Sequence, residues 1–278
     1  MKFTKMHGAG NDYIYINGFT EHCDDWGALS VKLSDRHFSV GSDGVIVILP
    51  SDKADFRMRM FNADGSEGKM CGNGSRCVAK YCYDKGLTDK TEFTLETLAG
   101  IKTLSLQVEN GVTKSVSVGM GTAEFSAPKV PVVWDDAGEV VRQKLSLTSG
   151  EWEITCVSMG NPHCVTFIDK SPRELNLASI GPEFENNAIF PERVNTEFIR
   201  VVDPHTLEMR VWERGSGETL ACGTGACASA AAAVKCGYCK AGEEITVKLL
   251  GGELNITCSP DYEITMRGPA EIAFEGEV

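Results

Sequence analysis

The sequence contains two matching segments whose cysteines are suited to acid–base chemistry. Residues 58–74 (MRMFNADGSEGKMCGNG) and residues 209–225 (MRVWERGSGETLACGTG) are separated by 151 positions. They share six residues, which are Met58/Met209, Arg59/Arg210, Glu67/Glu218, Cys71/Cys222, Gly72/Gly223 and Gly74/Gly225. Two thiols that face each other across a pseudo-twofold axis suit one reaction well. One thiol takes a proton from one face of a carbon and the other returns a proton to the opposite face.

Each segment predicts a strand, a glycine-rich turn and then a helix that begins at the cysteine. A helix start favours an anion, so we expect it to lower the thiol pKa of Cys71 and Cys222. A substrate carboxylate held by the backbone N–H groups of both helix starts would be stabilised as it gains charge on deprotonation at Cα. These two cysteines are therefore the predicted catalytic pair.

The Cα proton of an amino acid is very weakly acidic, and many racemases use pyridoxal phosphate to remove it. No lysine stands in an obvious cofactor-binding context here. We therefore predict a cofactor-independent route in which one cysteine is thiolate and the other is thiol, so that they titrate as a pair. No metal is expected, because Cys236 and Cys239 have no partner pair at zinc-binding spacing.

The local patterns predict a mixed α+β fold. Its two pseudo-symmetric halves would each be a curled, mainly antiparallel sheet or barrel around a central helix, with the active site in the cleft between them. The expected N-terminal half comprises residues 1–121 and 268–278, and the C-terminal half residues 122–267. Glycines and alternating side chains predict the individual elements. These are helices at 73–85 and 224–235, hairpins at 102–119 (turning at Asn110-Gly111) and 245–257, a buried strand at 45–49, and a crossover at 124–138.

Composition limits the class of partner. The 278 residues carry a net charge of −12, which argues against nucleic acid and anionic membrane surfaces. The chain has no apolar run near the ~20 residues of a membrane span and no apolar signal core at its start. Eleven cysteines, an odd number, make a disulfide framework unfavourable. We expect a cytoplasmic protein that acts on a small amino acid.

The motifs resemble those of the diaminopimelate epimerase family along essentially the whole chain. The resemblance is carried by residues 6–12 (MHGAGND), 61–67 (FNADGSE), 71–77 (CGNGSRC), 160–163 (GNPH), 193–197 (RVNTE), 212–215 (WERG), 218–226 (ETLACGTGA) and 268–271 (GPAE). It implies cofactor-independent epimerisation of LL-2,6-diaminopimelate to the meso isomer. That is a step toward lysine and peptidoglycan precursors. It also makes a homodimer plausible.

The resemblance also implies the residue roles. Cys71 and Cys222 would be the acid/base pair, and His163 and Glu213 would influence their protonation. The residues expected to bind substrate are Asn11, Asn62, Gly72, Asn73, Asn161, Asn195, Glu213, Arg214, Gly223 and Thr224. One position departs from some family members, which carry glutamine where this chain has Gly44. We therefore do not include Gly44 in the site.

Two other interpretations remain open at this stage. One is a related cofactor-independent racemase that acts on histidine, proline or hydroxyproline. Asn73 stands where the proline-racemase type usually has histidine, and histidine racemases are harder to separate. The other is a non-catalytic module that binds thiols or metal. It accounts for the many cysteines but explains neither the repeat nor the asparagines.

Overall fold

The computed structural model describes residues 1–134 and 138–278, so part of the expected crossover, 135–137, lies outside the described residues. The chain folds as two compact units. Unit 1 comprises Met1–Gly119 and Arg267–Val278, and unit 2 comprises Met120–Met266. The division at 121/122 and 267/268 stays a prediction. Each unit is described below by itself, and a strand that crosses a boundary is placed with the unit that holds most of it.

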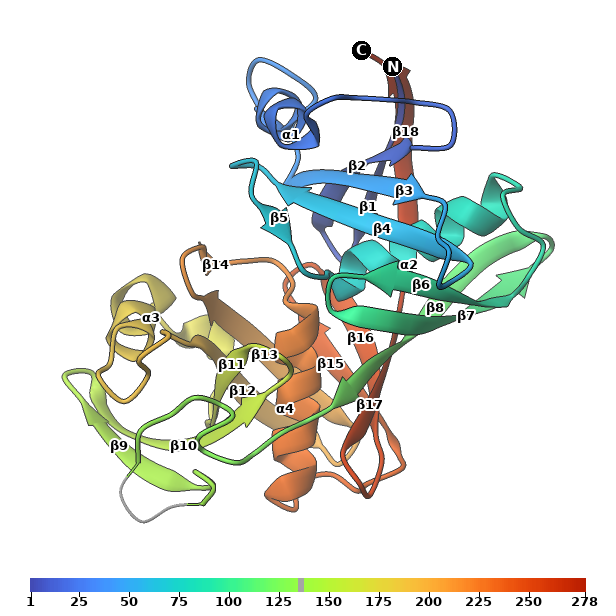
Figure 1. Cartoon of the computed structure of the whole chain (residues 1–278). Coiled ribbons are helices and arrows are strands. Elements are labelled where there is room, and N and C mark those ends of the chain that lie inside the picture. The colour runs from blue at the N-terminus through green and yellow to red at the C-terminus, as the bar shows by residue number, and fades with distance from the viewer. Residues whose placement is uncertain (135–137) are drawn as a thin grey trace. The chain divides into compact units, whose positions relative to one another are not determined.

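Unit 1 contains two helices and the strands that surround them (Figure 1). Its elements are β1 (Lys2–Gly8), β2 (Asn11–Asn17), α1 (Trp26–Ser34), β3 (Gly44–Leu49), β4 (Phe56–Asn62), β5 (Glu67–Gly68), α2 (Gly72–Asp84), β6 (Glu92–Thr97), β7 (Gly100–Glu109), β8 (Val112–Thr122) and β18 (Glu271–Glu277).

Unit 2 repeats this plan. Its elements are β9 (Gln143–Leu147), β10 (Gly150–Ser158), β11 (Pro162–Phe167), a 3₁₀ helix (Pro172–Glu174), α3 (Leu177–Glu185), β12 (Asn195–Asp203), β13 (Thr206–Glu213), β14 (Gly217–Glu218), α4 (Gly223–Lys235), β15 (Glu244–Leu249), β16 (Gly252–Cys258) and β17 (Glu263–Gly268).

Strand pairing is the same in both units. In unit 1, β1 pairs antiparallel with β2, β2 parallel with β3, β3 antiparallel with β4, and β4 parallel with β6. In unit 2, β10, β11, β12, β13 and β15 follow each other in the same order and with the same directions. The α+β fold with two pseudo-symmetric, mainly antiparallel halves is therefore confirmed.

The helices α2 and α4 begin and end where the local signals indicate. Cys71 and Cys222 are their N-caps, with extended backbone (φ −131° and −113°), and the helices then run for 13 residues each. Gly86 and Gly237 follow the C-caps with φ values of 71° and 79°, a conformation that glycine adopts without steric cost. The predicted helices are thus confirmed to within one residue at each end.

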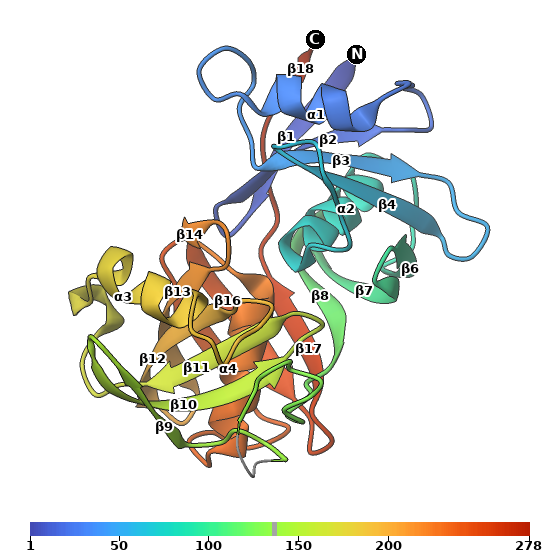
Figure 2. The same ribbon diagram turned by 60° about the vertical axis from the view of Figure 1, so that its left-hand side comes forward.

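Both helices lie at the centre of their units. Helix α4 contacts β10, β11, β12, β13, β15 and β16, and it runs among these strands in both views (Figures 1 and 2). Its six alanines from Ala226 to Ala233 are fully buried, and their small side chains let the curled sheet approach closely. Helix α2 contacts β1, β2 and β7 and is buried from Gly72 to Cys82. Each unit therefore wraps its sheet around one helix.

The two predicted hairpins also form. Strands β7 and β8 join through Asn110 and Gly111, whose φ values of 53° and 76° fit the left-handed conformation of a two-residue turn. Strands β15 and β16 pair from Glu244 opposite Thr257 to Leu249 opposite Gly252. The short strand expected at 45–49 is β3.

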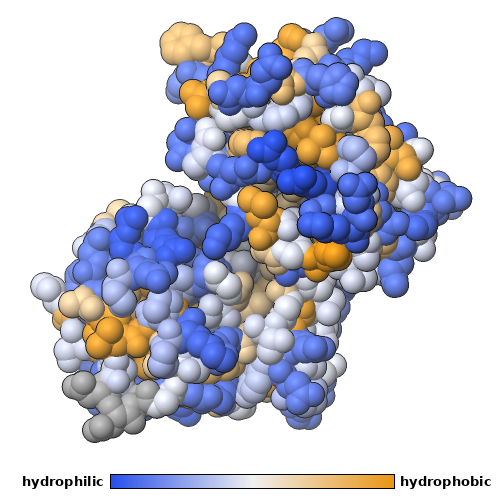
Figure 3. All heavy atoms as spheres, viewed as in Figure 1, coloured by the Kyte–Doolittle hydropathy of each residue, from blue (hydrophilic) through white to orange (hydrophobic). Residues whose placement is uncertain are grey.

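The surface is mixed in polarity. Hydrophilic residues are spread over the face in Figure 3, with hydrophobic residues among them. Within residues 1–134 and 138–278, no helix has the length and apolar character to cross a membrane.

Candidate active site

Cys71 and Cys222 lie at equivalent positions of their units. In each unit a strand turns back in a short hairpin, β4–β5 or β13–β14, before the helix that begins at the cysteine. A two-fold arginine–glutamate contact closes each hairpin. Arg59 Nε and Nη2 donate to Glu67 at 2.7 and 3.0 Å, and Arg210 Nε and Nη2 donate to Glu218 at 2.6 and 2.9 Å. The shared arginines and glutamates therefore fix the hairpins and leave the cysteines for chemistry.

The sulfur of Cys71 lies at the N-terminus of α2. Its Sγ accepts from the N–H of Gly74 at 3.2 Å, and its side chain is half-buried. The N–H groups of Gly72 and Asn73 have no acceptor within the helix because they belong to its first turn. The predicted anion-binding residues Gly72 and Asn73 thus stand at a helix start beside a thiol.

Asn11 is held against Cys71. The Cys71 thiol donates to Asn11 Oδ1 at 3.2 Å, while Asn11 Nδ2 donates to Asp43 Oδ2 at 2.8 Å. The same carboxylate oxygen accepts from the backbone N–H of Asp12 at 3.1 Å. Asp43 therefore fixes which end of the Asn11 amide faces the sulfur. Cys71 together with Asn11, Gly72 and Asn73 is called half-site 1 below.

Asn62 lies at the end of β4, where its Nδ2 donates to Ser66 Oγ at 3.0 Å. Its substrate role stays a prediction. Gly44 pairs with Asn62 in the ladder of β3 and β4. A Cβ at Gly44 would lie 2.0 Å from the carbonyl oxygen of Phe61, so this backbone accepts no side chain there. Glutamine at this position would require a different local backbone.

The sulfur of Cys222 occupies the same place at the start of α4 but is more enclosed. It accepts from the N–H of Gly225 at 3.3 Å and lies 3.5 Å from Thr224 Oγ1, and Cys222 is only 5% exposed. Burial raises the pKa of the Cys222 thiol well above its ordinary value, and the carboxylates of Glu213 and Glu197 raise it further. These effects outweigh the hydrogen bonds from Thr224 and Gly225. The expectation that the helix start lowers this pKa is therefore wrong for Cys222.

Glu213 contacts Cys222 directly. Burial raises the pKa of the Glu213 carboxyl, and hydrogen bonds from Thr219 and the Cys222 thiol act in the opposite direction. The thiol therefore donates to the carboxylate, which keeps the proton on sulfur. This is a physical basis for the predicted influence of Glu213 on the thiol.

His163 reaches Cys222 through a chain of side chains. His163 Nε2 lies 3.0 Å from Asn161 Oδ1, Asn161 Nδ2 donates to Thr224 Oγ1 at 3.3 Å, and Thr224 Oγ1 contacts the sulfur. On its other side, His163 Nδ1 lies 2.7 Å from Glu197 Oε1. Both His163 and Glu197 are fully buried. The predicted residues Asn161, His163 and Thr224 thus form one connected group with Cys222.

Asn195 and Arg214 complete the group in unit 2. Asn195 pairs with His163 between the parallel strands β11 and β12, and its Oδ1 accepts from the backbone N–H of Arg214 at 2.9 Å. The Arg214 guanidinium donates to the carbonyl of Glu192 at 2.9 Å. Cys222 with Asn161, His163, Asn195, Glu213, Arg214, Gly223 and Thr224 is called half-site 2 below.

Two carboxylates with contacts to this machinery were not predicted. Asp43 orients Asn11, and Glu197 contacts His163. Asn195 and Glu197 are two apart on one strand and so face the same side of the sheet. The alternation of side chains along a strand at residues 193–197 could have identified Glu197, because it places this residue on the same face as Asn195.

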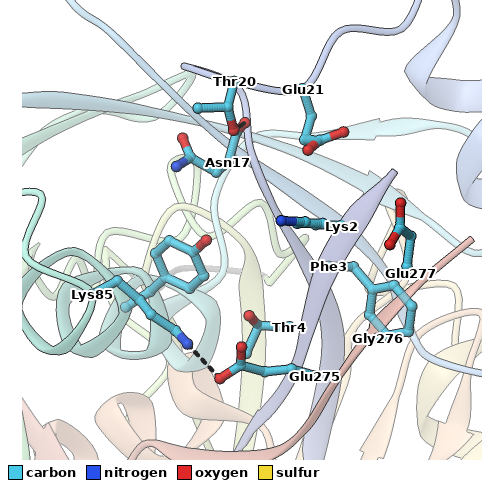
Figure 4. A pocket seen from close by; sticks show the side chains of 11 residues that line it. Lys2, Phe3, Thr4, Asn17, Thr20, Glu21, Lys85, Glu275, Gly276 and Glu277 are labelled. Atoms are coloured by element: carbon cyan, nitrogen blue, oxygen red, sulfur yellow. Dashed lines mark hydrogen bonds and ion pairs between the residues drawn. The ribbon is translucent and has the colours of Figure 1, made fainter.

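A hollow of about 560 Å³ on unit 1 lies away from these groups. Its wall includes Lys2, Tyr81, Lys85 and Glu275, and Lys85 pairs with Glu275 (Figure 4). Neither Cys71 nor any other predicted site residue lines it. Within the part of the chain that the structure describes, no group of three or more His, Cys, Asp or Glu is placed to hold a metal ion. The candidate chemistry therefore rests on the two half-sites.

The fold matches that of several solved structures of low sequence identity to this chain. It matches a hydroxyproline epimerase from Agrobacterium vitis (TM-score 0.71, 16% identity, 99% of this chain and 91% of that one). It also matches a probable proline racemase from Agrobacterium radiobacter (TM-score 0.73, 15% identity, 100% and 92%) and a Bacillus anthracis protein of the PhzF family (TM-score 0.70, 18% identity, 100% and 98%).

The sequence comparisons identify one family. The diaminopimelate epimerase family model matches residues 3–126 and 155–273. The diaminopimelate epimerase of Methanococcus maripaludis is 51% identical over 279 residues, which cover 100% of this chain and 99% of the relative. That of Bacillus cytotoxicus is 47% identical over 279 residues, covering 99% and 96%. The chain belongs to the diaminopimelate epimerase family, as its motifs indicate.

Proposed function

We propose that this protein interconverts LL- and meso-2,6-diaminopimelate without a cofactor, with Cys71 and Cys222 acting on opposite faces of one Cα. The observation that carries the proposal is the repeated N-cap. In both units the cysteine sulfur accepts an N–H from the first turn of a buried helix. Family membership supplies the substrate, and the reaction belongs to the supply of lysine and peptidoglycan precursors.

The backbone N–H groups at the two helix starts would bind the carboxylate next to the reacting carbon. Gly72 and Asn73 supply them in unit 1, and Gly223 and Thr224 in unit 2. Deprotonation at Cα moves charge into that carboxylate, so donors fixed beforehand stabilise the transition state more than the ground state.

The surroundings of Cys222 favour its thiol form in the resting protein. Burial and nearby carboxylates raise the pKa of the Cys222 thiol, and we assign it on this ground as the proton donor to the LL isomer, an assignment that exchange by the single-cysteine variants tests. After the Cys71 thiol, which donates to Asn11 Oδ1 in this structure, has lost its proton to solvent, the thiolate removes the Cα proton and the Cys222 S–H gives its proton to the other face. The products are a Cys71 thiol and a Cys222 thiolate, so protons and charge balance. The reverse reaction uses the opposite roles.

The remaining predicted residues suit a substrate with two amino-acid ends. Arg214 is a donor for a carboxylate, while Glu213 and the asparagine carbonyls of Asn11, Asn161 and Asn195 are acceptors for ammonium groups. We include Asn62 in this set on the family resemblance. A substrate with one charged end, such as proline, would leave part of this set without a partner.

We also propose that the protein is a homodimer. Strand β18 has one partner in the ladders of the described residues, β1, and an open edge can pair with another chain. It carries Phe274, which is 49% exposed and packs edge-to-face on Phe3 at 6.0 Å between ring centroids. Sedimentation of wild type and Phe274→Glu would test this, with a monomeric wild type contradicting it.

Thiol catalysis requires a reducing compartment, for which we propose the cytoplasm.

Deuterium incorporation from solvent tests the proposed reaction. Reduced protein with LL-2,6-diaminopimelate in D₂O, without added cofactor, should exchange the Cα proton and form the meso isomer, followed by NMR. Exchange without a change of configuration would contradict the two-base mechanism. No exchange by folded, reduced protein would contradict the substrate, and L-histidine and L-proline would then be tested in the same way.

A further inference from the structure

Glu197 is a buried carboxylate with no role in the proposed reaction so far. It lies on β12, is fully buried, and its Oε1 is 2.7 Å from His163 Nδ1. Its other oxygen, Oε2, is buried without a hydrogen-bond partner within the described residues. Such a carboxylate is costly to bury, so its presence calls for an explanation.

The repeat shows that the fold does not need a carboxylate at this position. At the same spacing that relates Cys71 to Cys222, Glu197 corresponds to Ile46. The packing is equivalent as well. A Cβ on Gly74 would meet Ile46 Cδ1 at 2.6 Å, and a Cβ on Gly225 would meet Glu197 Oε1 at 2.7 Å. An apolar side chain fills the place in unit 1, so the carboxylate in unit 2 serves something other than packing.

The partners of the two ring nitrogens of His163 indicate where its protons lie. A carboxylate only accepts, so Nδ1 must carry a proton where it faces Glu197. The amide oxygen of Asn161 also only accepts, so Nε2 must carry a proton where it faces Oδ1 at 3.0 Å. Both ring nitrogens then face acceptors, the arrangement that suits an imidazolium paired with Glu197.

The orientation of the Asn161 amide also determines which group donates to the Cys222 sulfur. With its oxygen toward His163, Asn161 points its NH₂ at Thr224 Oγ1. The Thr224 oxygen is then an acceptor, which leaves its own proton to donate to Cys222 Sγ. A neutral His163 with a bare Nε2 would turn the amide around, and the Thr224 hydroxyl would donate to Asn161 instead.

We propose that Glu197 is a positioning residue of the epimerase site. It holds His163 doubly protonated and thereby directs the Thr224 hydroxyl toward the Cys222 sulfur. This inference rests on the proposed function. When Cys222 gives its proton to the substrate carbon, the resulting thiolate keeps two donors, the Thr224 hydroxyl and the Gly225 N–H. Glu197 touches neither substrate nor sulfur and acts through the chain of three side chains.

Other ionisable groups surround this chain. Cys222 faces Glu213 from β13 as well as Glu197, and Glu197 also acts on the buried thiol of Cys164 on β11. Replacing Glu197 by glutamine removes one negative charge, and the ring then loses one proton. Because the Glu197 carboxylate also raises the pKa of the Cys222 thiol, the variant acts on Cys222 through the loss of this charge as well as through the reversal of the hydrogen bonds.

Nitrogen-15 NMR of the histidine rings tests the proposal without substrate. In the wild-type protein at pH 7.5, His163 should show two protonated ring nitrogens, with its signals assigned by their loss in His163→Gln. In Glu197→Gln the ring should be neutral. A matched control is Glu208→Gln, which removes a mostly buried carboxylate from the neighbouring strand β13, where it pairs with Arg200 at 2.9 Å. This control should leave the His163 signals unchanged.

Kinetics with LL-2,6-diaminopimelate give the second readout. Glu197→Gln should lower kcat roughly 10- to 100-fold, the size of one lost hydrogen bond to a charged group, with little change in KM. Glu197→Asp should keep the doubly protonated ring and recover part of kcat. If Glu197→Gln does not fold, Glu197→Ile is measured in its place, because isoleucine is the residue at the equivalent position of unit 1, Ile46.

The outcomes separate this inference from the proposed function. A neutral His163 in the wild type, or a Glu197→Gln kcat equal to that of Glu208→Gln, overturns the role of Glu197. If the wild type did not epimerise diaminopimelate, the proposed function would fall, and the ring signals of wild type and Glu197→Gln would still decide whether Glu197 controls His163.

Discussion

In half-site 1 the sulfur of Cys71 lies 3.2 Å from the neutral amide of Asn11, whereas in half-site 2 the sulfur of Cys222 contacts the carboxylate of Glu213. The frame is the same in both units, with equivalent strands, hairpins and helix caps. The ionisable groups differ, because the carboxylate of Glu213 contacts Cys222 directly, whereas that of Asp43 reaches Cys71 only through Asn11. Glu197 of unit 2 corresponds to Ile46 of unit 1 at the spacing of 151, and His163 corresponds to Tyr13 at the spacing of 150 that relates Asn161 to Asn11.

This difference indicates how a symmetric frame can support an asymmetric resting state. An epimerase of the two-base type needs one thiol and one thiolate at the same time. Identical surroundings would give the two sulfurs equal affinity for the proton. The carboxylates around Cys222 remove that equality and keep the proton there. The repeated strands and helix starts provide the two sulfurs, and the carboxylates found only in unit 2 favour the protonated form of Cys222.

Removing either sulfur is expected to have the largest effect. Cys71→Ala and Cys222→Ala should each lower kcat for epimerisation by at least about 10³-fold, because each removes an acid or base that nothing else replaces. The measurement is conversion of LL to meso substrate, with circular dichroism to show that the fold is kept. Near-full activity in either variant would contradict the two-base mechanism.

The two single variants also distinguish the roles of the sulfurs. Cys222→Ala retains the proposed base for the LL isomer, so it should still exchange some Cα proton with solvent without forming the meso isomer. Cys71→Ala should exchange the LL isomer more slowly. Faster exchange in Cys71→Ala than in Cys222→Ala would reverse the assignment of acid and base.

Local sequence signals were sufficient to predict the helix starts, the helix ends and the hairpin turn. A cysteine followed by Gly-x-Gly marks each helix start, Gly86 and Gly237 mark the ends, and Asn110-Gly111 marks a hairpin. These predictions hold because capping and turn geometry depend on a few neighbouring residues. Matching of residues 58–74 with 209–225 then extends each local signal to the other unit.

The electrostatics of half-site 2 could not be obtained in this way. The thiol pKa of Cys222 depends on burial and on carboxylates that β12 and β13 bring from 25 and 9 positions away in the chain, respectively. The contact of Glu197 with His163 requires the parallel pairing of β11 and β12, which lie on either side of α3. The expectation of a lowered thiol pKa took account only of N–H donors at the helix start. Burial and the two carboxylates have a larger effect on this pKa.

Adding one methyl group at equivalent glycines should affect the two units differently. In Gly225→Ala the new Cβ would press on Glu197 Oε1, which His163 holds in place, whereas in Gly74→Ala it would press on the flexible end of Ile46. We expect Gly225→Ala to lower kcat about tenfold or more. Gly74→Ala should mainly lower stability, by about 1 kcal/mol. Steady-state kinetics and urea unfolding of both variants measure this, and equal losses of kcat would contradict it.

The buried thiol of Cys77 should make stability depend on pH in unit 1. Burial raises its pKa to about 11, so the folded state keeps the proton while the unfolded state loses it above pH 9. The contribution is fully present below pH 9. It is lost at about 1.4 kcal/mol per pH unit as pH rises toward 11. Tyr15, whose pKa is also raised by burial, adds a loss of the same sign at higher pH.

Cys77→Ala, which introduces the residue of unit 2 (Ala228), should therefore flatten the decline of stability between pH 9 and 11. Urea unfolding across this range measures it. Val78→Ala is the matched control, since it removes buried volume from the same helix and keeps the thiol, so its curve should run parallel to that of the wild type. Parallel curves for Cys77→Ala and wild type would contradict the assignment to Cys77.

The smallest expected difference concerns the arginines that close the hairpins. Arg210 is 12% exposed and also donates to the carbonyls of Pro172 and Leu175 at 2.7 and 2.8 Å, whereas Arg59 is 31% exposed. Truncation of Arg210 leaves two carbonyls without a partner, at a cost of about 2 kcal/mol. Truncation of Arg59 removes a more exposed ion pair, at a cost under about 1 kcal/mol. Urea unfolding of Arg210→Ala and Arg59→Ala compares them. Since lysine cannot form the two-fold contact with Glu218, Arg210→Lys should recover little of the loss, and full recovery would show that charge alone closes the hairpin.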